Sequence, residues 1–101
     1  MANFVKVCKL ADICAGSGRT VDYNGRAVAL FNVDGNFYAI DNTCLHRGGP
    51  LGEGELDGKM VVCPWHGWRY DVTTGSNEMN PSVTVQKFQI KVEGEDILVA
   101  E

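Results

Sequence analysis

The chain has 101 residues, which is enough for one domain with a single modest core. Its hydrophobic content of 45% and charged content of 22% are ordinary for a soluble globular protein. The net charge of −4 argues against a nucleic-acid partner, because a phosphate backbone requires a basic surface. We find no apolar run long enough for a membrane span and no signal-peptide core, so we expect no membrane association and a cytoplasmic protein.

Short β segments separated by turn residues occupy the first part of the chain. The expected strands are Phe4–Lys9, Arg19–Tyr23, Arg26–Asn32 and Phe37–Asp41. Leu10–Ile13 is too short for more than one helical turn. Asn24-Gly25 is the strongest hairpin signal, because both central positions of the favoured turn need a positive φ. Together with a second turn at Asp34-Gly35, it predicts a three-stranded meander.

The later segments also show β patterning. Alternation stops between Asn42 and Gly52, which is rich in Gly and Pro, and a strand pair is then expected around Asp57-Gly58. The remaining expected strands are Lys59–Val62, Trp68–Val72, Val83–Phe88, Gln89–Glu93 and Ile97–Ala100. No segment has a sustained helical period. We therefore predict an all-β fold, a small antiparallel sandwich or barrel with two loops reserved for chemistry, as one domain over residues 1–101.

Both histidines of the chain follow a cysteine closely. Cys44 and His46 form a C-x-H motif, Cys63 and His66 form a C-x-x-H motif, and sixteen residues separate His46 from Cys63. Two thiolates and two imidazoles can hold zinc or an iron–sulfur cluster. Structural zinc fingers usually place two cysteines in one motif and two histidines in the other, whereas both motifs here are mixed. Mixed motifs suit a binuclear centre in which one iron takes both thiolates; a zinc-binding assembly module stays open as an alternative.

The two motifs and their flanks resemble a known family. Cys44–Gly48 and Cys63–Gly67 resemble the cluster-binding boxes of Rieske 2Fe–2S proteins, and Phe37–Asn42 and Trp68–Gly75 resemble the strands beside them. The small single-domain form is similar to the Rieske ferredoxins of bacterial ring-hydroxylating oxygenases. This resemblance implies a small Rieske-type β sandwich or barrel, with a cluster-binding subdomain over about residues 42–72 formed by two loops.

The resemblance also implies the ligands of one 2Fe–2S cluster. Cys44 and Cys63 would hold the inner iron, and His46 and His66 would hold the outer iron. No histidine then remains for the mononuclear iron of an oxygenase, so we expect an electron-transfer protein and no enzyme. Its partners would be a reductase, expected to be flavin-dependent, and a terminal oxygenase. A small Rieske-type subunit of an assimilatory nitrite reductase is the alternative within the same class.

Residues around the motifs have two interpretations each. Gly48, Gly49 and Gly67 either let backbone N–H groups approach the sulfurs or are ordinary turn glycines. Trp65 either shields the cluster from water or packs in the core. The Asn80–Ser82 segment either covers the cluster, as a proline-bearing loop does in the family, or is a surface turn.

Three positions predict a low reduction potential. High-potential Rieske proteins have a disulfide-forming cysteine in each box and a serine after the second, where this chain has Gly49, Trp65 and Trp68. Tyr70 retains the family's tyrosine. Fewer hydrogen bonds to sulfur stabilise the reduced state less, so we expect a midpoint of roughly −150 mV.

Further candidates lie outside the ligand set. Arg47 and Arg69 either tune docking or are solvated charges, and the acidic rim beside them contains Glu53, Glu55 and Asp57. Four cysteines in a chain without a secretion signal indicate metal or redox use before disulfides. The alternating stretch around Cys8 predicts a core position for it, and Cys14 is expected in a loop.

Overall fold

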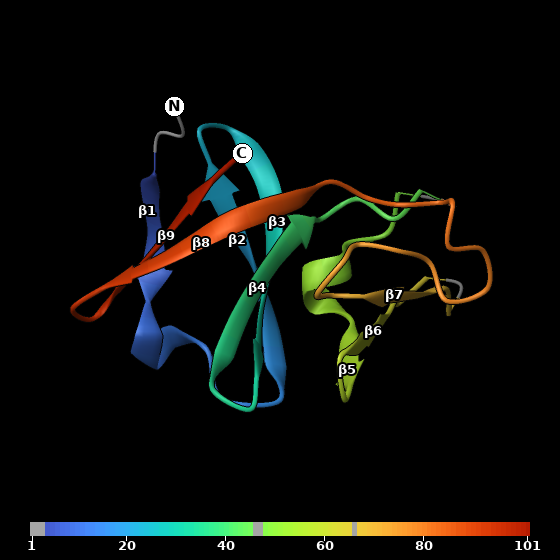
Figure 1. The fold of residues 1–101 in the computed structure, drawn as a ribbon, viewed down its shortest axis with the longest axis horizontal. Helices are drawn as coiled ribbons and strands as arrows, with labels where there is room; N and C mark the ends of the chain where they lie inside the picture. The colour runs from blue at the N-terminus through green and yellow to red at the C-terminus, as the bar shows by residue number, and fades with distance from the viewer. Residues whose placement is uncertain (1–3, 46–47, 66) are drawn as a thin grey trace.

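A six-stranded antiparallel sheet forms the larger part of the structure, a computed structural model that describes residues 4–45, 48–65 and 67–101. Its strands follow the spatial order β1-β9-β8-β4-β3-β2. They are β1 (Val5–Lys9), β2 (Ser17–Tyr23), β3 (Arg26–Val33), β4 (Asn36–Asp41), β8 (Lys87–Glu93) and β9 (Asp96–Ala100). The two outer strands of the sheet, β1 and β2, contact each other, so the sheet curls into a nearly closed barrel (Figure 1).

A second, three-stranded sheet lies beside the barrel, to the right in Figure 1. It consists of β5 (Glu55–Asp57), β6 (Met60–Val62) and β7 (Arg69–Asp71) in that order. Two 3-10 turns, η1 (Leu10–Asp12) and η2 (Leu51–Glu53), complete the elements. The prediction of an all-β, barrel-like fold is confirmed. The two motif loops belong to the part of the chain that leaves the barrel after β4 and returns at β8.

The tight turns of the barrel follow from local sequence. Asn24 and Gly25 have φ values of 51° and 88°, and Asp34 and Gly35 have φ values of 53° and 89°. Positive φ at both central positions gives the turn whose twist matches that of paired strands. The expected meander is therefore confirmed as β2-β3-β4.

One expected pair of strands is wrong. Val83–Phe88 and Gln89–Glu93 do not form two strands; a single strand, β8, begins at Lys87. Residues 83–86 run instead along the loop that follows β7, where the Val85 N–H donates to the Gly75 carbonyl at 2.9 Å. This segment bridges the small sheet and the barrel, so its apolar residues reflect burial in that connection rather than strand pairing.

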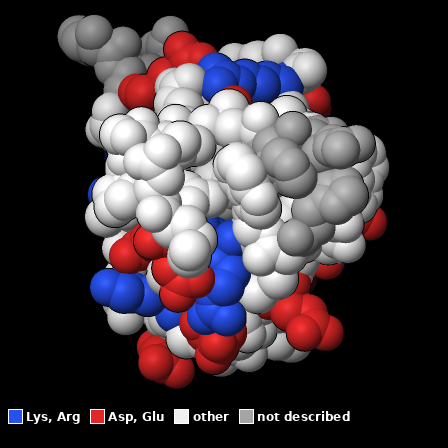
Figure 2. Space-filling view, turned by 90° about the vertical axis from the view of Figure 1, so that its right-hand side faces the viewer, with Lys and Arg blue, Asp and Glu red and all other residues white. Residues whose placement is uncertain are grey.

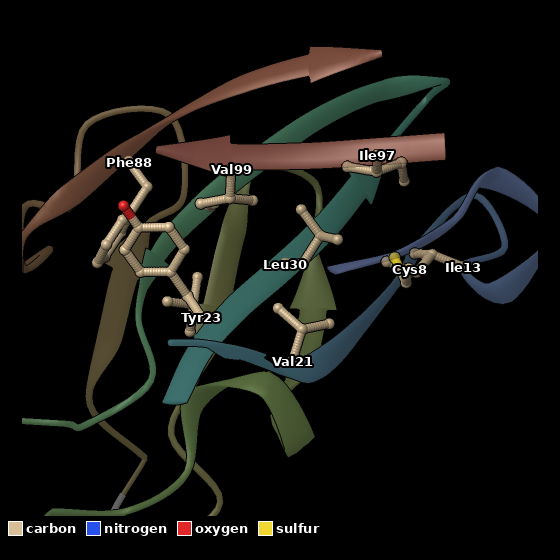
Figure 3. Close-up of a cluster of buried hydrophobic side chains, with 10 residues drawn as sticks. Cys8, Ile13, Val21, Tyr23, Leu30, Phe88, Ile97 and Val99 are labelled. Carbon is tan, nitrogen blue, oxygen red and sulfur yellow. The ribbon is translucent and has the colours of Figure 1, made fainter. Parts of the chain in front are cut away.

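Two hydrophobic cores lie on opposite faces of β3. The barrel core contains Val28 and Leu30, and the core between the barrel and the small sheet contains Ala29 and Phe31. Successive side chains of a strand point to opposite faces, which explains why β3 is apolar without alternation. Figure 3 shows the barrel core, whose members are Cys8, Ile13, Val21, Tyr23, Val28, Leu30, Ala39, Phe88, Ile97 and Val99.

The second core anchors both motif cysteines. Its buried members are Ala29, Phe31, Ile40, Cys44, Leu51, Val61, Cys63, Tyr70, Val72 and Val85. The core position predicted for Cys8 is confirmed, and Cys14 is exposed as expected of a loop thiol. None of the helices in the described ranges is both long and apolar enough to cross a membrane.

Candidate metal centre

The first motif begins a loop that closes on itself through its backbone. The Gly48 N–H donates to the Cys44 carbonyl at 2.7 Å, and the Cys44 N–H donates to the Gly49 carbonyl at 3.0 Å. These two bonds tie the cysteine to the residues four and five positions later. Cys44, in the loop that follows β4, is thereby held by the backbone of its own loop.

The second motif repeats this arrangement at the same spacings. The Gly67 N–H donates to the Cys63 carbonyl at 3.0 Å, and the Cys63 N–H donates to the Trp68 carbonyl at 2.7 Å. Gly48 and Gly67 have nearly equal φ values of 74° and 76°. A side chain would strain both positions, so each of the two turns requires its glycine.

Gly49 has a different role, at the point where the two loops meet. A Cβ atom built on Gly49 would lie 2.7 Å from the Sγ of Cys63, closer than two such atoms can approach. Glycine therefore leaves the space that the second thiol occupies. The two loops converge, and each brings one cysteine.

Both motif thiols are buried. Cys44 and Cys63 are 1% and 2% exposed, and none of the four cysteines, each within the described ranges, is in a disulfide. Two buried thiols on converging loops fit the thiolate half of an iron–sulfur centre, because the thiolate is the ligand and clusters are tuned by their buried surroundings.

Tyr70 lies beside the first thiol. Its hydroxyl is 3.6 Å from the Cys44 Sγ and accepts a hydrogen bond from the Leu45 N–H at 3.2 Å. Burial, reinforced by the hydrogen bond with Cys44, raises the pKa of Tyr70 to about 12. The phenol is therefore protonated at physiological pH and has one O–H to donate.

The predicted imidazole ligands, His46 and His66, lie outside the described residues, and so does Arg47. Within the described ranges, no group of three or more His, Cys, Asp or Glu side chains is placed to hold a metal ion. A metal centre at the cysteine pair would therefore need further ligands, and the sequence places one histidine shortly after each cysteine.

Two neighbouring predictions have clear outcomes. Trp65 is 57% exposed, so the core-packing interpretation is wrong; its Cγ lies 3.1 Å from the position a Gly49 Cβ would take. Asn80–Ser82 is exposed and forms a turn in which the Val83 N–H donates to the Asn80 carbonyl at 2.9 Å. The structure thus shows a surface turn there.

Charged side chains pair within the chain at the edge of the small sheet. Arg69 contacts Asp57 at 2.9 Å and Glu78 at 3.1 Å. Figure 2 looks at the end of the molecule to which the loops belong, where a broad uncharged area has acidic and basic side chains gathered above and below it. Large apolar side chains exposed on this part of the chain are Leu45, Trp65 and Met79.

No pattern in the sequence pointed to Asn77. Its side chain is buried, with 5% of the residue exposed, and Asn77 lies opposite Tyr70 in an isolated antiparallel bridge. This pairing joins β7 to a loop without regular strand structure, so periodicity could not reveal it.

The fold is a small β barrel, and two loops, each closed by a hydrogen bond from a glycine N–H, bring two buried thiols together. These features define a class of small metalloproteins whose metal centre is held by two loops. The chain belongs to the Rieske [2Fe-2S] domain family, whose profile matches residues 3–89. It accordingly carries one Rieske-type 2Fe–2S cluster. The buried thiols, the Tyr70 hydroxyl and the space left by Gly49 fit such a cluster.

Relatives of the whole chain are electron carriers. Ferredoxin CarAc of Metapseudomonas resinovorans is 36% identical over 96% of this chain and 92% of its own length. A solved complex of reduced oxygenase and oxidized ferredoxin in carbazole 1,9a-dioxygenase matches with a TM-score of 0.87 and 34% identity, over 96% and 92% of the two chains. The chain is therefore an electron-transfer ferredoxin rather than a catalytic subunit.

A second kind of relative shares the fold. The crystal structure of a putative NADH-dependent nitrite reductase small subunit from Mycobacterium tuberculosis matches with a TM-score of 0.91. It is 26% identical and covers 100% of this chain and 96% of its own. Its lower identity makes the dioxygenase ferredoxins the better match for function.

Proposed function

We propose that this ferredoxin takes single electrons from a flavin-dependent reductase and passes them to the terminal oxygenase of a ring-hydroxylating system. The observation that carries this proposal is the pair of buried thiols on two converging loops, in a chain that matches oxygenase-system ferredoxins over nearly its whole length. The cluster, when bound, accepts and releases one electron. The chain's own residues hold it, limit its contact with water and set its potential.

The proposed ligands are Cys44 and Cys63 for one iron and His46 and His66 for the other. Burial and convergence support the two cysteines. The position of each histidine two or three residues after a cysteine, on loops with the same backbone closure, supports the imidazoles. We further propose that residues 1–101 act as one Rieske domain, with its cluster-binding part over about residues 42–72.

The proposed docking surface is the area at this end of the molecule where the described side chains are uncharged (Figure 2). Leu45 and Trp65 are 55% and 57% exposed and belong to the two cysteine loops, and Met79 is exposed on the neighbouring loop. A hollow lies between this neighbouring loop and residues 67–69 of the second motif. Exposed apolar side chains with a charged rim are typical of interaction sites. Four cysteines without a disulfide among them, all in the described ranges, support a reducing compartment, which is consistent with the cytoplasm.

An anaerobic electron-transfer experiment tests this function. The purified protein should be brown, bleach with dithionite, and return to the oxidised spectrum when mixed with the terminal oxygenase of carbazole 1,9a-dioxygenase. Stopped-flow absorbance measures the rate. A colourless protein that contains zinc would refute the cluster, and a reduced cluster that the oxygenase does not reoxidise would count against the proposed acceptor.

The nitrite reductase role is the second candidate, favoured by the high structural similarity to the small subunit. In that role the chain would form a stable complex with a nitrite reductase large subunit. Co-purification with such a subunit, combined with no electron transfer to an oxygenase, would establish this alternative.

A further inference from the structure

Two connections join the barrel to the segment that contains the small sheet, and they lie side by side. The chain leaves the barrel after Asp41, the last residue of β4, and returns to it after Gln86, the residue before β8 (Figure 1). The Asp41 N–H donates to the Gln86 carbonyl at 2.8 Å. A side chain that binds both residues therefore acts on both connections at once.

Arg26, the first residue of β3, is such a side chain. Its Nη2 donates to Asp41 Oδ2 at 2.9 Å and to Gln86 Oε1 at 2.7 Å, which uses both protons of that nitrogen. Its Nη1 donates to Glu101 Oε1 at 3.0 Å, just after β9. The guanidinium carbon also lies 5.0 Å from the centre of the Phe88 ring on β8, within cation–π range. One guanidinium thus joins four segments that are distant in the sequence.

The Asp41 carboxylate extends this contact to the first motif loop. While its Oδ2 accepts from Arg26, its Oδ1 accepts the Thr43 N–H at 3.0 Å. Thr43 immediately precedes Cys44 and pairs with Pro50 in an isolated antiparallel bridge. Because the charge-assisted bond from Arg26 holds the carboxylate, it also holds the acceptor of the Thr43 N–H.

We propose that Arg26 is a positioning residue that keeps residues 41–44, at the start of the first motif loop, closed against the barrel. The Arg26 and Asp41 side chains are 37% and 25% exposed, and pairs with such exposure contribute little to global stability. Their effect is on local opening, which breaks these contacts while the barrel core stays buried. The proposal needs no partner protein, and only its cluster readout rests on the proposed ligand role of Cys44.

The key variant is Arg26→Gln, which removes the charge and cannot bind all three acceptors at once. We expect the Asp41 and Thr43 amides to exchange hydrogen about fivefold faster, because local opening then breaks fewer contacts. The Lys91 and Leu98 amides, paired in the β8–β9 hairpin, should not change. Mass spectrometry with residue resolution measures the exchange. In cluster-loaded protein with excess chelator, the visible absorbance should also decay about fivefold faster.

Asp41→Asn separates the contact with Arg26 from the contact with Thr43. Asparagine keeps an oxygen for the Thr43 N–H but replaces the other oxygen by an NH₂ group, which cannot accept from Arg26. This variant should reproduce the effect of Arg26→Gln, and the double variant should add little to either single one, because both remove the same contact.

Lys6→Gln is the matched control. It removes an exposed ion pair between Lys6 and Asp96, 3.2 Å apart, which joins β1 to β9 within the barrel. This variant loses a cation and an ion pair, as Arg26→Gln does, but it leaves both connections to the small sheet untouched. Exchange at Thr43 and the rate of cluster loss should therefore equal those of the unmodified protein.

Unchanged exchange at Asp41 and Thr43 in Arg26→Gln would overturn the proposal, and so would an equal increase at Lys91 and Leu98. Faster exchange without faster cluster loss would also overturn it, because the first motif loop would then not depend on the contact. If Arg26→Gln does not fold, Asp41→Asn decides by the same criteria. The expected exchange in a protein that binds no cluster would support this inference and refute the proposed function.

Discussion

Gly49 of the first motif loop and Cys63 of the second are in such close contact that a Cβ on Gly49 would lie 2.7 Å from the Cys63 Sγ. This contact brings the two motif loops together. Gly48, the preceding residue, has space for a side chain, because a Cβ there would lie 3.8 Å from its nearest neighbour, on Thr43. Its φ of 74°, however, is one that residues with a side chain rarely adopt.

These neighbouring glycines give a matched pair of variants. We expect Gly49→Ala to displace Cys63 and greatly lower the iron and sulfide bound per protein. Gly48→Ala should retain the cluster but lower the free energy of unfolding by about 1–2 kcal/mol because of its positive φ. Iron and sulfide analysis and urea unfolding measure the two effects. Full cluster content in Gly49→Ala would show that the contact does not matter for assembly.

The proposed imidazole ligands predict a spectroscopic loss. His46→Ala and His66→Ala should each remove the Rieske-type absorption and electron paramagnetic resonance signals, because each leaves one iron without a ligand. Leu45→Ala, in the same loop as His46, serves as the control and should keep both signals. If either histidine variant retained the spectrum of the unmodified protein, that histidine would not be a ligand.

The reduction potential is predicted from Gly49, Trp65 and Trp68, which replace the locking cysteines and the serine donor of high-potential relatives. We expect a midpoint of roughly −150 mV, at the low end of the Rieske range. Redox titration at pH 7 measures it. A midpoint above about +100 mV would contradict the argument from these three positions.

Met79 tests the docking surface without disturbing the fold, because it is 89% exposed. Met79→Glu should lower the rate of electron transfer to the terminal oxygenase by about tenfold, equivalent to about 1.4 kcal/mol, and leave the midpoint unchanged. Val92→Glu is the matched control. Val92 is also exposed and lies on β8, in the hairpin at the end of the barrel away from the motif loops (Figure 1). Equal rates for both variants would exclude a docking role for Met79.

The two cysteines outside the motifs should differ in reactivity. Burial raises the pKa of the Cys8 thiol above its usual value of 9.0, with a further contribution from Asp12, whereas Cys14 is exposed. At pH 8, iodoacetamide should therefore modify Cys14 and leave Cys8 protonated and unmodified. Raising the pH toward its raised pKa should increase Cys8 labelling. Mass spectrometry of cluster-loaded protein measures this, and Cys14→Ser should show no adduct at pH 8.

Sequence alone was sufficient for features that depend on neighbouring residues. The positive-φ turns at Asn24-Gly25 and Asp34-Gly35 are local, so the meander could be predicted. The two cysteine–histidine motifs likewise indicate the kind of metal centre, because metal chemistry depends on donor type and spacing. The local pattern failed at residues 83–86, where burial beside another loop resembles a strand in sequence.

Tertiary structure decided everything that depends on contact between distant segments. The near contact of Gly49 with Cys63 and the position of Tyr70 at the Cys44 sulfur require the second sheet to pack against the barrel. The pairing of Asn77 with Tyr70 likewise joins β7 to an irregular loop. The sequence determines which donor atoms are present, whereas the distances between them depend on packing between segments that meet only when the chain is folded.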